Sequence, residues 1–193
     1  MKKPFKKIII VLFAIVLCLC AVSCGDKDDF VPAGYKRASN KNADHTLYVP
    51  ESWVVDMSTG VTSARASKND SSNISFMSFE LDKSLINSET SESETEEKEL
   101  LDEFWDYYSA EFTKTFPDMT YAEDGNGANM LVSKLKAKKY IYTATVTGAE
   151  YKFMQIVVIK GETVYLLTYT AKAELFDTHY DTVIKIAGYI EIK

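Results

Sequence analysis

Two histidines are the starting point for any acid–base or metal chemistry, because the chain of 193 residues contains no others. His45 follows Asp44 at the expected edge of the domain, and His179 lies between Asp177 and Asp181. Positions two apart on a helix point about 200° away from each other, so these aspartates do not converge with His179 on one ligand. We therefore interpret His179 as a surface or partly packed residue, with a metal site as the alternative.

The sequence contains no recognisable motif for a catalytic serine or cysteine nucleophile. A hydrolase needs a nucleophile, a base and an orienting acid, and no serine lies in a G-x-S-x-G context. All three cysteines lie in the first 24 residues: Cys18, Cys20 and Cys24. Residues 25–193 contain no cysteine, so a catalytic cysteine, a cysteine-based metal site, a disulfide and thiol redox chemistry are excluded for them.

Two acidic segments contain the residue types that Ca²⁺ prefers. Residues 88–99 include six glutamates and one lysine, and residues 124–127 have the sequence Asp-Gly-Asn-Gly. A calcium site needs fixed, convergent oxygens and further ligands such as a distal glutamate. We therefore predict a solvated acidic loop at about 84–99 and a hairpin turn at 124–127. No metal or other cofactor is expected.

The first 24 residues have the pattern of a secretory leader. Its positive region contains four lysines: Lys2, Lys3, Lys6 and Lys7. An apolar run follows over residues 8–22, and its length of about 15 residues is short of the roughly 20 that span a bilayer. The run ends in Ala21-Val22-Ser23-Cys24. This ending resembles the lipobox of bacterial lipoproteins, in which leucine is more usual at the position of Ala21.

The resemblance to a lipobox implies cleavage between Ser23 and Cys24 and a diacylglycerol on Cys24. Two acyl chains hold a protein stably on a membrane, whereas one chain binds only marginally. We therefore expect residues 1–23 to be a signal peptide, and the mature protein to be lipid-anchored on the extracytoplasmic face of the cell membrane. The alternatives are an ordinary signal peptide cut elsewhere and an uncleaved anchor.

The charge balance argues against nucleic acid as a partner. The chain has 22 basic and 28 acidic residues, and removal of the four leader lysines leaves 18 against 28, a net charge of −10. Phosphate binding needs clustered lysine and arginine. A domain this acidic is expected to be held at the membrane by its lipid rather than by a basic surface.

Hydrophobic periodicity divides the remaining chain into a tether and a domain. Residues 24–43 are polar and are expected to be the lipidated cysteine and a flexible tether, with an ordered N-terminal arm as the alternative. The domain is expected to occupy 44–193. Its expected strands are 46–49, 51–55, 61–67, 73–81, 130–135, 139–147, 151–160 and 163–171. Its expected helices are 101–116, ended by Pro117, and 174–187, closed by Gly188 as the C-cap.

This order of elements predicts an α+β fold, in which a central antiparallel sheet carries helices packed on its faces. Residues 151–160 and 163–171, joined by a tight turn at 161–162, are apolar on both faces, which favours a central position. The first helix has an aromatic stripe that we interpret as core, with a ligand groove as the alternative. Tyr107 lies off this stripe and is the candidate contact residue on the surface.

Three stretches are similar to the PsbP-like superfamily, which includes photosystem II PsbP and DcrB-type bacterial lipoproteins. They are the entry segment Leu-Tyr-Val-Pro-Glu-Ser-Trp at 47–53, the hairpin strand Val-Tyr-Leu-Leu-Thr-Tyr-Thr-Ala at 164–171, and Glu-Leu-Phe at 174–176 before the last helix. The resemblance covers about residue 46 to the C-terminus. It implies an α/β/α sandwich and a mostly non-catalytic accessory or binding role, and it transfers no catalytic or metal-binding residue.

We therefore expect a non-catalytic binding or accessory lipoprotein of the cell envelope, with a protein partner there that the sequence does not identify. One alternative is a small envelope enzyme that works through carboxylates, which would place two acids in a deep cleft. The other is a small-molecule carrier, which would have a closed apolar cavity between sheet and helix.

Overall fold

A seven-stranded sheet forms the framework of the domain in this computed structural model, which describes residues 31–57, 61–67, 69–82, 84 and 94–193. Every neighbouring pair of strands in the sheet is antiparallel. The spatial order is β4 (Val54–Asp56), β5 (Thr62–Arg65), β6 (Asn73–Glu80), β10 (Thr163–Lys172), β9 (Ala149–Lys160), β8 (Leu135–Val146) and β7 (Thr120–Val132). The interior positions of β9 and β10 confirm the prediction drawn from their two apolar faces.

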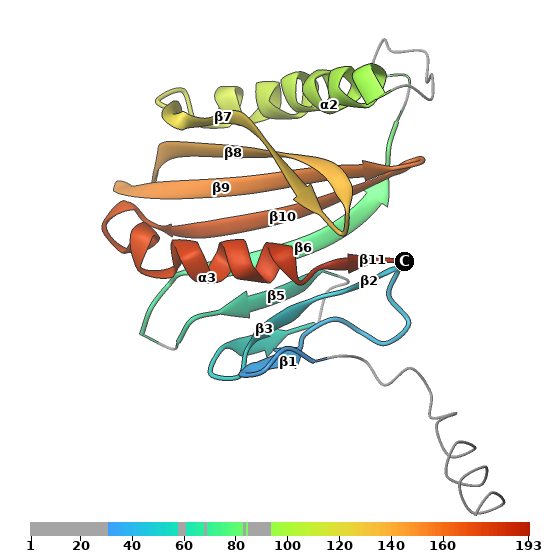
Figure 1. The fold of residues 1–193 in the computed structure, drawn as a ribbon. Coiled ribbons are helices and arrows are strands. Elements are labelled where there is room, and N and C mark those ends of the chain that lie inside the picture. Colours follow the sequence, from blue (N-terminus) through green and yellow to red (C-terminus); the bar gives the residue numbers. More distant parts are fainter. Residues whose placement is uncertain (1–30, 58–60, 68, 83, 85–93) are drawn as a thin grey trace, which may run out of the picture. The chain divides into compact units, whose positions relative to one another are not determined.

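Helix α2 (Glu94–Thr115) covers one face of the sheet (Figure 1). Its residues Leu101, Phe104 and Trp105 are buried against β8, β9 and β10, so the aromatic stripe is core as predicted. The helix ends two residues before Pro117, the expected helix breaker. It begins earlier than expected, because the last six residues of the acidic run at 88–99 are helical. The prediction of a loop to residue 99 is therefore wrong at its C-terminal end.

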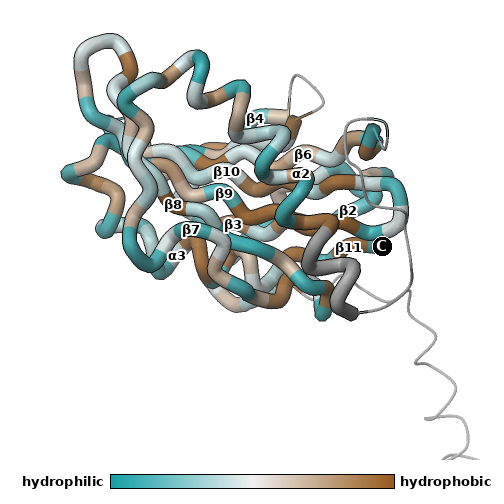
Figure 2. The backbone as a smooth tube through the Cα atoms, turned by 90° about the horizontal axis from the view of Figure 1, so that it is seen from above, coloured by the Kyte–Doolittle hydropathy of each residue, from teal (hydrophilic) through white to brown (hydrophobic). Residues whose placement is uncertain are grey.

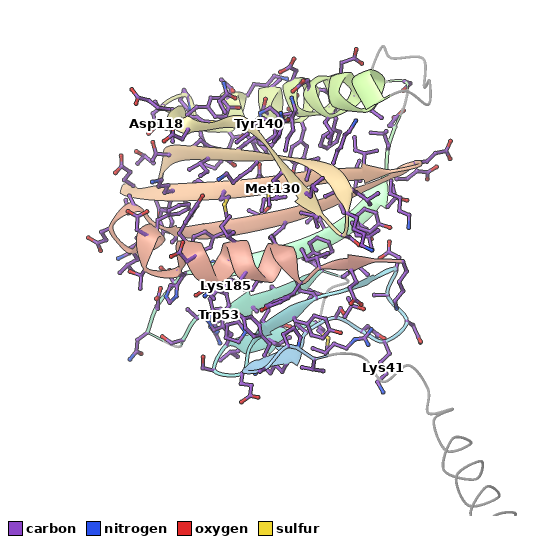
Figure 3. All side chains as sticks on the ribbon, viewed as in Figure 1. Lys41, Trp53, Asp118, Met130, Tyr140 and Lys185 are labelled. Atoms are coloured by element: carbon purple, nitrogen blue, oxygen red, sulfur yellow. The ribbon has the colours of Figure 1, made fainter. Side chains whose placement is uncertain are left out.

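Helix α3 (Phe176–Gly188) packs on the opposite face, preceded by the short helix η2 (Ala173–Leu175). Phe176, Val183 and Ile186 are buried there beside Trp53, in a second hydrophobic cluster. Figure 3 shows this separation, with Tyr140 beneath α2 and Trp53 on the side of α3. Gly188 is not the C-cap that the sequence predicted, because the helix continues through it to a cap at Tyr189 with φ −96°.

Short strands outside the seven-stranded sheet form two small sheets, and the first of these strands lies before residue 44, the expected start of the domain. Strand β1 (Tyr35–Arg37) pairs with β3 (Tyr48–Pro50), and β2 (His45–Thr46) pairs with β11 (Glu191–Ile192). The tether predicted over 24–43 is therefore wrong for its C-terminal part, where the alternative of an ordered arm holds. Ala38 anchors this arm, because its side chain is buried and its N–H donates to the carbonyl of Leu47. Residues 24–30 lie outside the described residues.

The β7–β8 hairpin departs most from the predicted pattern. Its turn is at Ser133 and Lys134, which have φ values of 52° and 67° and lack the glycine that signals such turns. The predicted turn at 124–127 lies instead inside β7, at a shift of register. A Cβ on Gly125 would lie 2.5 Å from the Cβ of Ile141, so this glycine permits close approach of two strands.

The hydropathy of the backbone follows this architecture. Figure 2 shows hydrophobic stretches in the strands and hydrophilic ones at several of the turns. Among the described residues, no helix is both long and apolar enough to cross a membrane.

Candidate binding site

The two edges of the seven-stranded sheet carry two different pockets. One lies at the β7–β8 end beneath the first half of α2 and has a volume of about 380 Å³. We call it the hairpin pocket, and it is lined by Leu101, Asn129, Met130, Leu131, Lys136, Ala137 and Lys138. The other lies at the β4–β5 end and has a volume of about 630 Å³.

The hairpin pocket is built by cross-strand pairs and one helix residue. Strand register places Asn129 opposite Lys138 and Leu131 opposite Lys136, so these side chains share one face of the hairpin. Leu101 closes the pocket from α2, where it is buried in the aromatic cluster. Leu131 is the most exposed large hydrophobic residue described, at 65%. The pocket therefore presents an apolar surface that is open to solvent at Leu131.

Two lysines of β8, Lys136 and Lys138, line this apolar surface. The hairpin contains four lysines within residues 134–139, and residues 129–139 include no carboxylate. Lys138 is only 5% exposed and is paired with Asp102 of α2, which fixes the helix against β8. Lys139 points to the other face, where its ammonium donates to the hydroxyl of Tyr180 at 2.7 Å. A buried ammonium needs such partners, because desolvating an unpaired charge costs several kcal/mol.

The second pocket, which we call the edge pocket, is polar. Its lining residues are Val54, Val55, Asp56, Ser63, Ala64, Arg65, Ser67, Asn69, Asp70, Ser71 and Asn73. Asp70 lies at its wall, and its Oδ2 is 2.7 Å from Nε2 of His179 on α3. Trp53 packs edge-to-face on the His179 ring at 5.7 Å. This clamp joins the segment before β6 to α3.

The protonation state of Asp70 decides whether its carboxyl could act as a general acid in the edge pocket. Partial burial tends to raise the pKa of Asp70, but hydrogen bonds from Ser72 and His179 outweigh burial and hold the pKa below its ordinary value. The carboxyl is therefore ionised at neutral pH, which is the wrong state for a general acid. Both of its oxygens accept hydrogen bonds, from the Ser72 N–H at 2.8 Å and from His179. The contact between Asp70 and His179 ties the segment before β6 to α3.

The residues singled out in the sequence are not brought together. Cys24 and Ser23 lie outside the described residues. Tyr107 is 45% exposed on α2, as expected for a residue off the aromatic stripe, but it does not line either pocket. His45 is buried against Phe76 rather than placed at the domain edge, and its Nδ1 lies 2.8 Å from Asp44 Oδ1. In the described part of the chain, no three His, Cys, Asp or Glu residues gather as a metal site.

Sequence reasoning missed both pockets. Asp70 and His179 are 109 residues apart, and nothing in their local sequence signals that they meet. One sequence pattern pointed to the hairpin pocket: lysines alternate with apolar residues at 134–138. That alternation places Lys136 and Lys138 on one face of a strand. The expected strand boundary at residue 135 separated these lysines from Leu131.

Comparison with solved structures shows which fold this is. Cyanobacterial PsbP from Synechocystis sp. PCC 6803 matches with a TM-score of 0.55 at 12% identity, over 88% of this chain and 99% of that one. The domain has the PsbP fold. The PsbP-like α+β architecture predicted from the sequence is thereby confirmed.

Two further structures share the PsbP fold at low identity. The Ran-binding protein Mog1p of Saccharomyces cerevisiae has a TM-score of 0.54 at 8% identity, over 82% of this chain and 95% of that one. A protein from Bacteroides thetaiotaomicron has a TM-score of 0.54 at 8% identity, over 83% of this chain and 49% of that one. No protein-family model matches the sequence, and no curated protein matches it significantly. The likeness therefore establishes fold, and function rests on the site.

Proposed function

We propose that this protein is a lipoprotein of the bacterial cell envelope, anchored by a diacylglycerol on Cys24, whose PsbP-like domain binds a partner without catalysing a reaction. The anchoring half of the proposal is supported by the leader sequence, in which four lysines, a short apolar run and the lipobox-like Ala21-Val22-Ser23-Cys24 occur in order. This order supports a position of the domain on the extracytoplasmic face of the membrane.

The binding half of the proposal rests on one observation, the apolar hairpin pocket at an open edge of the sheet. Leu131 is exposed there although a leucine side chain gains about 2 kcal/mol on burial. An exposed apolar patch rimmed by polar residues is typical of an interaction site. The PsbP fold also occurs in a Ran-binding protein, which supports a binding role for this scaffold.

The anchoring half is tested with labelled fatty acid in cells that express the full chain. Wild type incorporates the label and sediments with membranes, whereas Cys24→Ala does neither. Cys20→Ala is the matched control, because it removes a leader cysteine four residues before the lipobox cysteine and leaves Cys24 in place. Equal labelling of wild type and Cys24→Ala would show that the anchor lies elsewhere.

The binding half is tested by isolating the full-length protein from detergent-solubilised membranes and measuring what accompanies it. The proposal predicts a reproducible partner in fixed ratio, which an unrelated lipoprotein carrying the same leader does not retain. Repeated isolation of the protein alone would contradict a binding role. Retention by both lipoproteins would assign the association to the anchor.

A further inference from the structure

We propose that the edge pocket is a second binding site, which takes a neutral saccharide. The sugar hydroxyls would exchange hydrogen bonds with the polar side chains of the lining, and the C–H face of one sugar ring would lie on Val54. This inference goes beyond the proposed function, because it uses neither the lipid anchor nor the hairpin pocket and names a ligand of another class.

The first support is the position of the pocket on the sheet. Strand register puts Val54 opposite Arg65 and Arg65 opposite Asn73, so these three side chains share one face. It is the face that α2 covers, because Met77 and Phe79 follow Asn73 at even spacing along β6 and pack on the hydrophobic cluster under α2. In the part of the chain that the structure describes, no residue of β4 or β5 belongs to that cluster. Helix α2 therefore leaves the β4–β5 corner of its face uncovered, and side chains of this corner line the edge pocket.

The second support is that a fixed wall turns this corner of the sheet into a pocket. The N–H groups of Asn69 and Asp70 donate to Ser67 Oγ, at 3.3 and 3.1 Å. Asp70 in turn accepts from the Ser72 N–H and contacts His179. The volume of about 630 Å³ lies within the roughly 300–1,000 Å³ of small-molecule sites. Because the wall is already ordered, a ligand that binds there does not have to fix it.

The third support is the set of hydrogen-bonding groups. Arg65 is exposed, and its guanidinium has no hydrogen-bond or ion-pair partner among the described residues. Asn73 Nδ2 donates to the carbonyl of Ser71 at 2.9 Å, which leaves its Oδ1 as an acceptor. A guanidinium only donates, whereas the carboxylate of Asp56 only accepts. Each sugar hydroxyl both donates and accepts, so one ligand with several hydroxyls can satisfy all of these groups.

The charge of the lining favours a neutral ligand. The charged lining residues are Arg65, Asp56 and Asp70. One guanidinium and two carboxylates give no positive excess that would attract an anion, and a cation would meet the unpaired charge of Arg65. Val54 is 39% exposed and lies opposite Arg65, so the polar lining also contains an apolar surface for the C–H face of a sugar ring.

The test uses the full-length protein in a detergent without a sugar headgroup and saturation-transfer NMR. The probes are glucose, galactose, mannose, xylose, N-acetylglucosamine and the di- and trisaccharides of glucose and N-acetylglucosamine. Glucuronate and the zwitterion alanylalanine are the charged controls. The proposal predicts saturable binding of at least one neutral saccharide with a dissociation constant of about 1 mM or below. High salt should not weaken this binding, because the ligand has no charge to screen.

Three substitutions locate the site. Arg65→Met keeps the length of the side chain but removes its donors, and it should weaken saccharide binding about tenfold or more. Its urea midpoint should equal that of wild type, because Arg65 is exposed and unpaired. Lys185→Met is the matched control at an exposed cation of α3 and should leave binding unchanged. Leu131→Glu in the hairpin pocket should also leave saccharide binding unchanged.

Several outcomes would overturn the proposal. Absence of saturable binding to every neutral saccharide contradicts it outright. Binding that Arg65→Met leaves unchanged, or that Leu131→Glu weakens, would place the sugar outside the edge pocket. Glucuronate binding tighter than glucose binding and weakened by salt would assign an anion site, and binding of alanylalanine alone would assign a site for zwitterions. The proposed function depends instead on lipid labelling and on a partner isolated from membranes, so each proposal can fail while the other holds.

Discussion

The two edges of the seven-stranded sheet differ in how well their unpaired backbone N–H and C=O groups are protected from pairing with other chains. At the β4 edge the strand is three residues long, it contains Asp56, and a hydrogen-bonded clamp between Asp70 and His179 secures the neighbouring loop. At the β7 edge the strand is 13 residues long and ends in an uncharged segment beside an apolar pocket. Unpaired strand edges are liabilities in solution. The less protected edge is the one that carries the binding site proposed above.

The two edges also differ in which elements of the fold support them. The β7 end is supported from both faces, by Leu101 and Asp102 of α2 on one side and by the Tyr180 contact of α3 on the other. The β4 end is held by pairing with β5, by the Asp70–His179 clamp and by the packing of Trp53. We therefore expect the Leu101 substitution to destabilise the β7 end and pH to affect the β4 end through Asp70.

The largest expected effect is that of Leu101→Ala. Leu101 is buried beneath α2 and forms the helix side of the hairpin pocket, so its truncation should lower the free energy of unfolding by about 3 kcal/mol. Tyr107→Ala on the same helix removes an exposed side chain and should cost about 0.5 kcal/mol or less. Urea unfolding measures both. Similar losses for the two variants would contradict the role of α2 as support for the β7 end.

The next effect is that of Gly125→Ala. The added Cβ would lie 2.5 Å from the Cβ of Ile141, so β7 and β8 must separate, and we expect a loss of about 2 kcal/mol. Gly148→Ala is the matched control, because Gly148 has φ 83° but open space around it, and strain alone costs about 1 kcal/mol. Thermal unfolding compares the two variants. A Gly125→Ala protein as stable as wild type would show that close packing at the bulge is not needed.

A smaller effect is expected at the β4 edge from Asp70→Asn. The folded-state pKa of Asp70 lies below its ordinary value, so its ionised form contributes stability at neutral pH that is lost as pH falls through that lowered pKa. The variant should lose about 1 kcal/mol at pH 7, a value discounted because the carboxyl is 21% exposed. The gap between wild type and variant should close below about pH 4.

Urea unfolding from pH 7 to pH 3 measures this gap. Asp177→Asn is the control, because Asp177 is 90% exposed and its ion-pair distance to Lys152 is 3.9 Å. A gap between wild type and Asp70→Asn that stays constant to pH 3 would contradict a contribution from the ionised clamp.

The smallest expected effect on stability is that of Leu131→Glu. The side chain is already exposed, so the free energy of unfolding should change by less than about 0.5 kcal/mol. Combined with loss of the partner that wild type retains on isolation from membranes, an unchanged stability would separate a binding role from a structural one. A large loss on urea unfolding would mean that Leu131 belongs to the core and that the β7 edge is closed.

Local signals in the sequence predicted the central part of the fold and missed its edges. The β9–β10 hairpin was predictable because Gly161, with φ 61°, stands between two apolar runs. The β7–β8 turn was not, because Ser133 and Lys134 adopt positive φ without a glycine to signal it. The glycines at 125 and 127 signalled a turn but serve a bulged strand, since their role depends on Ile141 and Tyr140 of the next strand.

The same limit applies to the candidate site. The aromatic stripe of α2 was visible in its spacing, and its burial followed from that. The two-residue strands β2 and β11 are too short to show a period, and they meet only through the fold. The Asp70–His179 clamp likewise joins distant segments. Long-range pairing of short segments is set by tertiary packing, which local pattern does not encode.

Amide hydrogen exchange of the full-length protein, alone and with the partner that is isolated with it from membranes, tests whether the hairpin pocket is the binding site. We expect the partner to slow exchange in Ala128–Val132, which borders the hairpin pocket, and to leave Val54–Asp56 unchanged. Protection at Val54–Asp56 with none at Ala128–Val132 would contradict the assignment of the open edge.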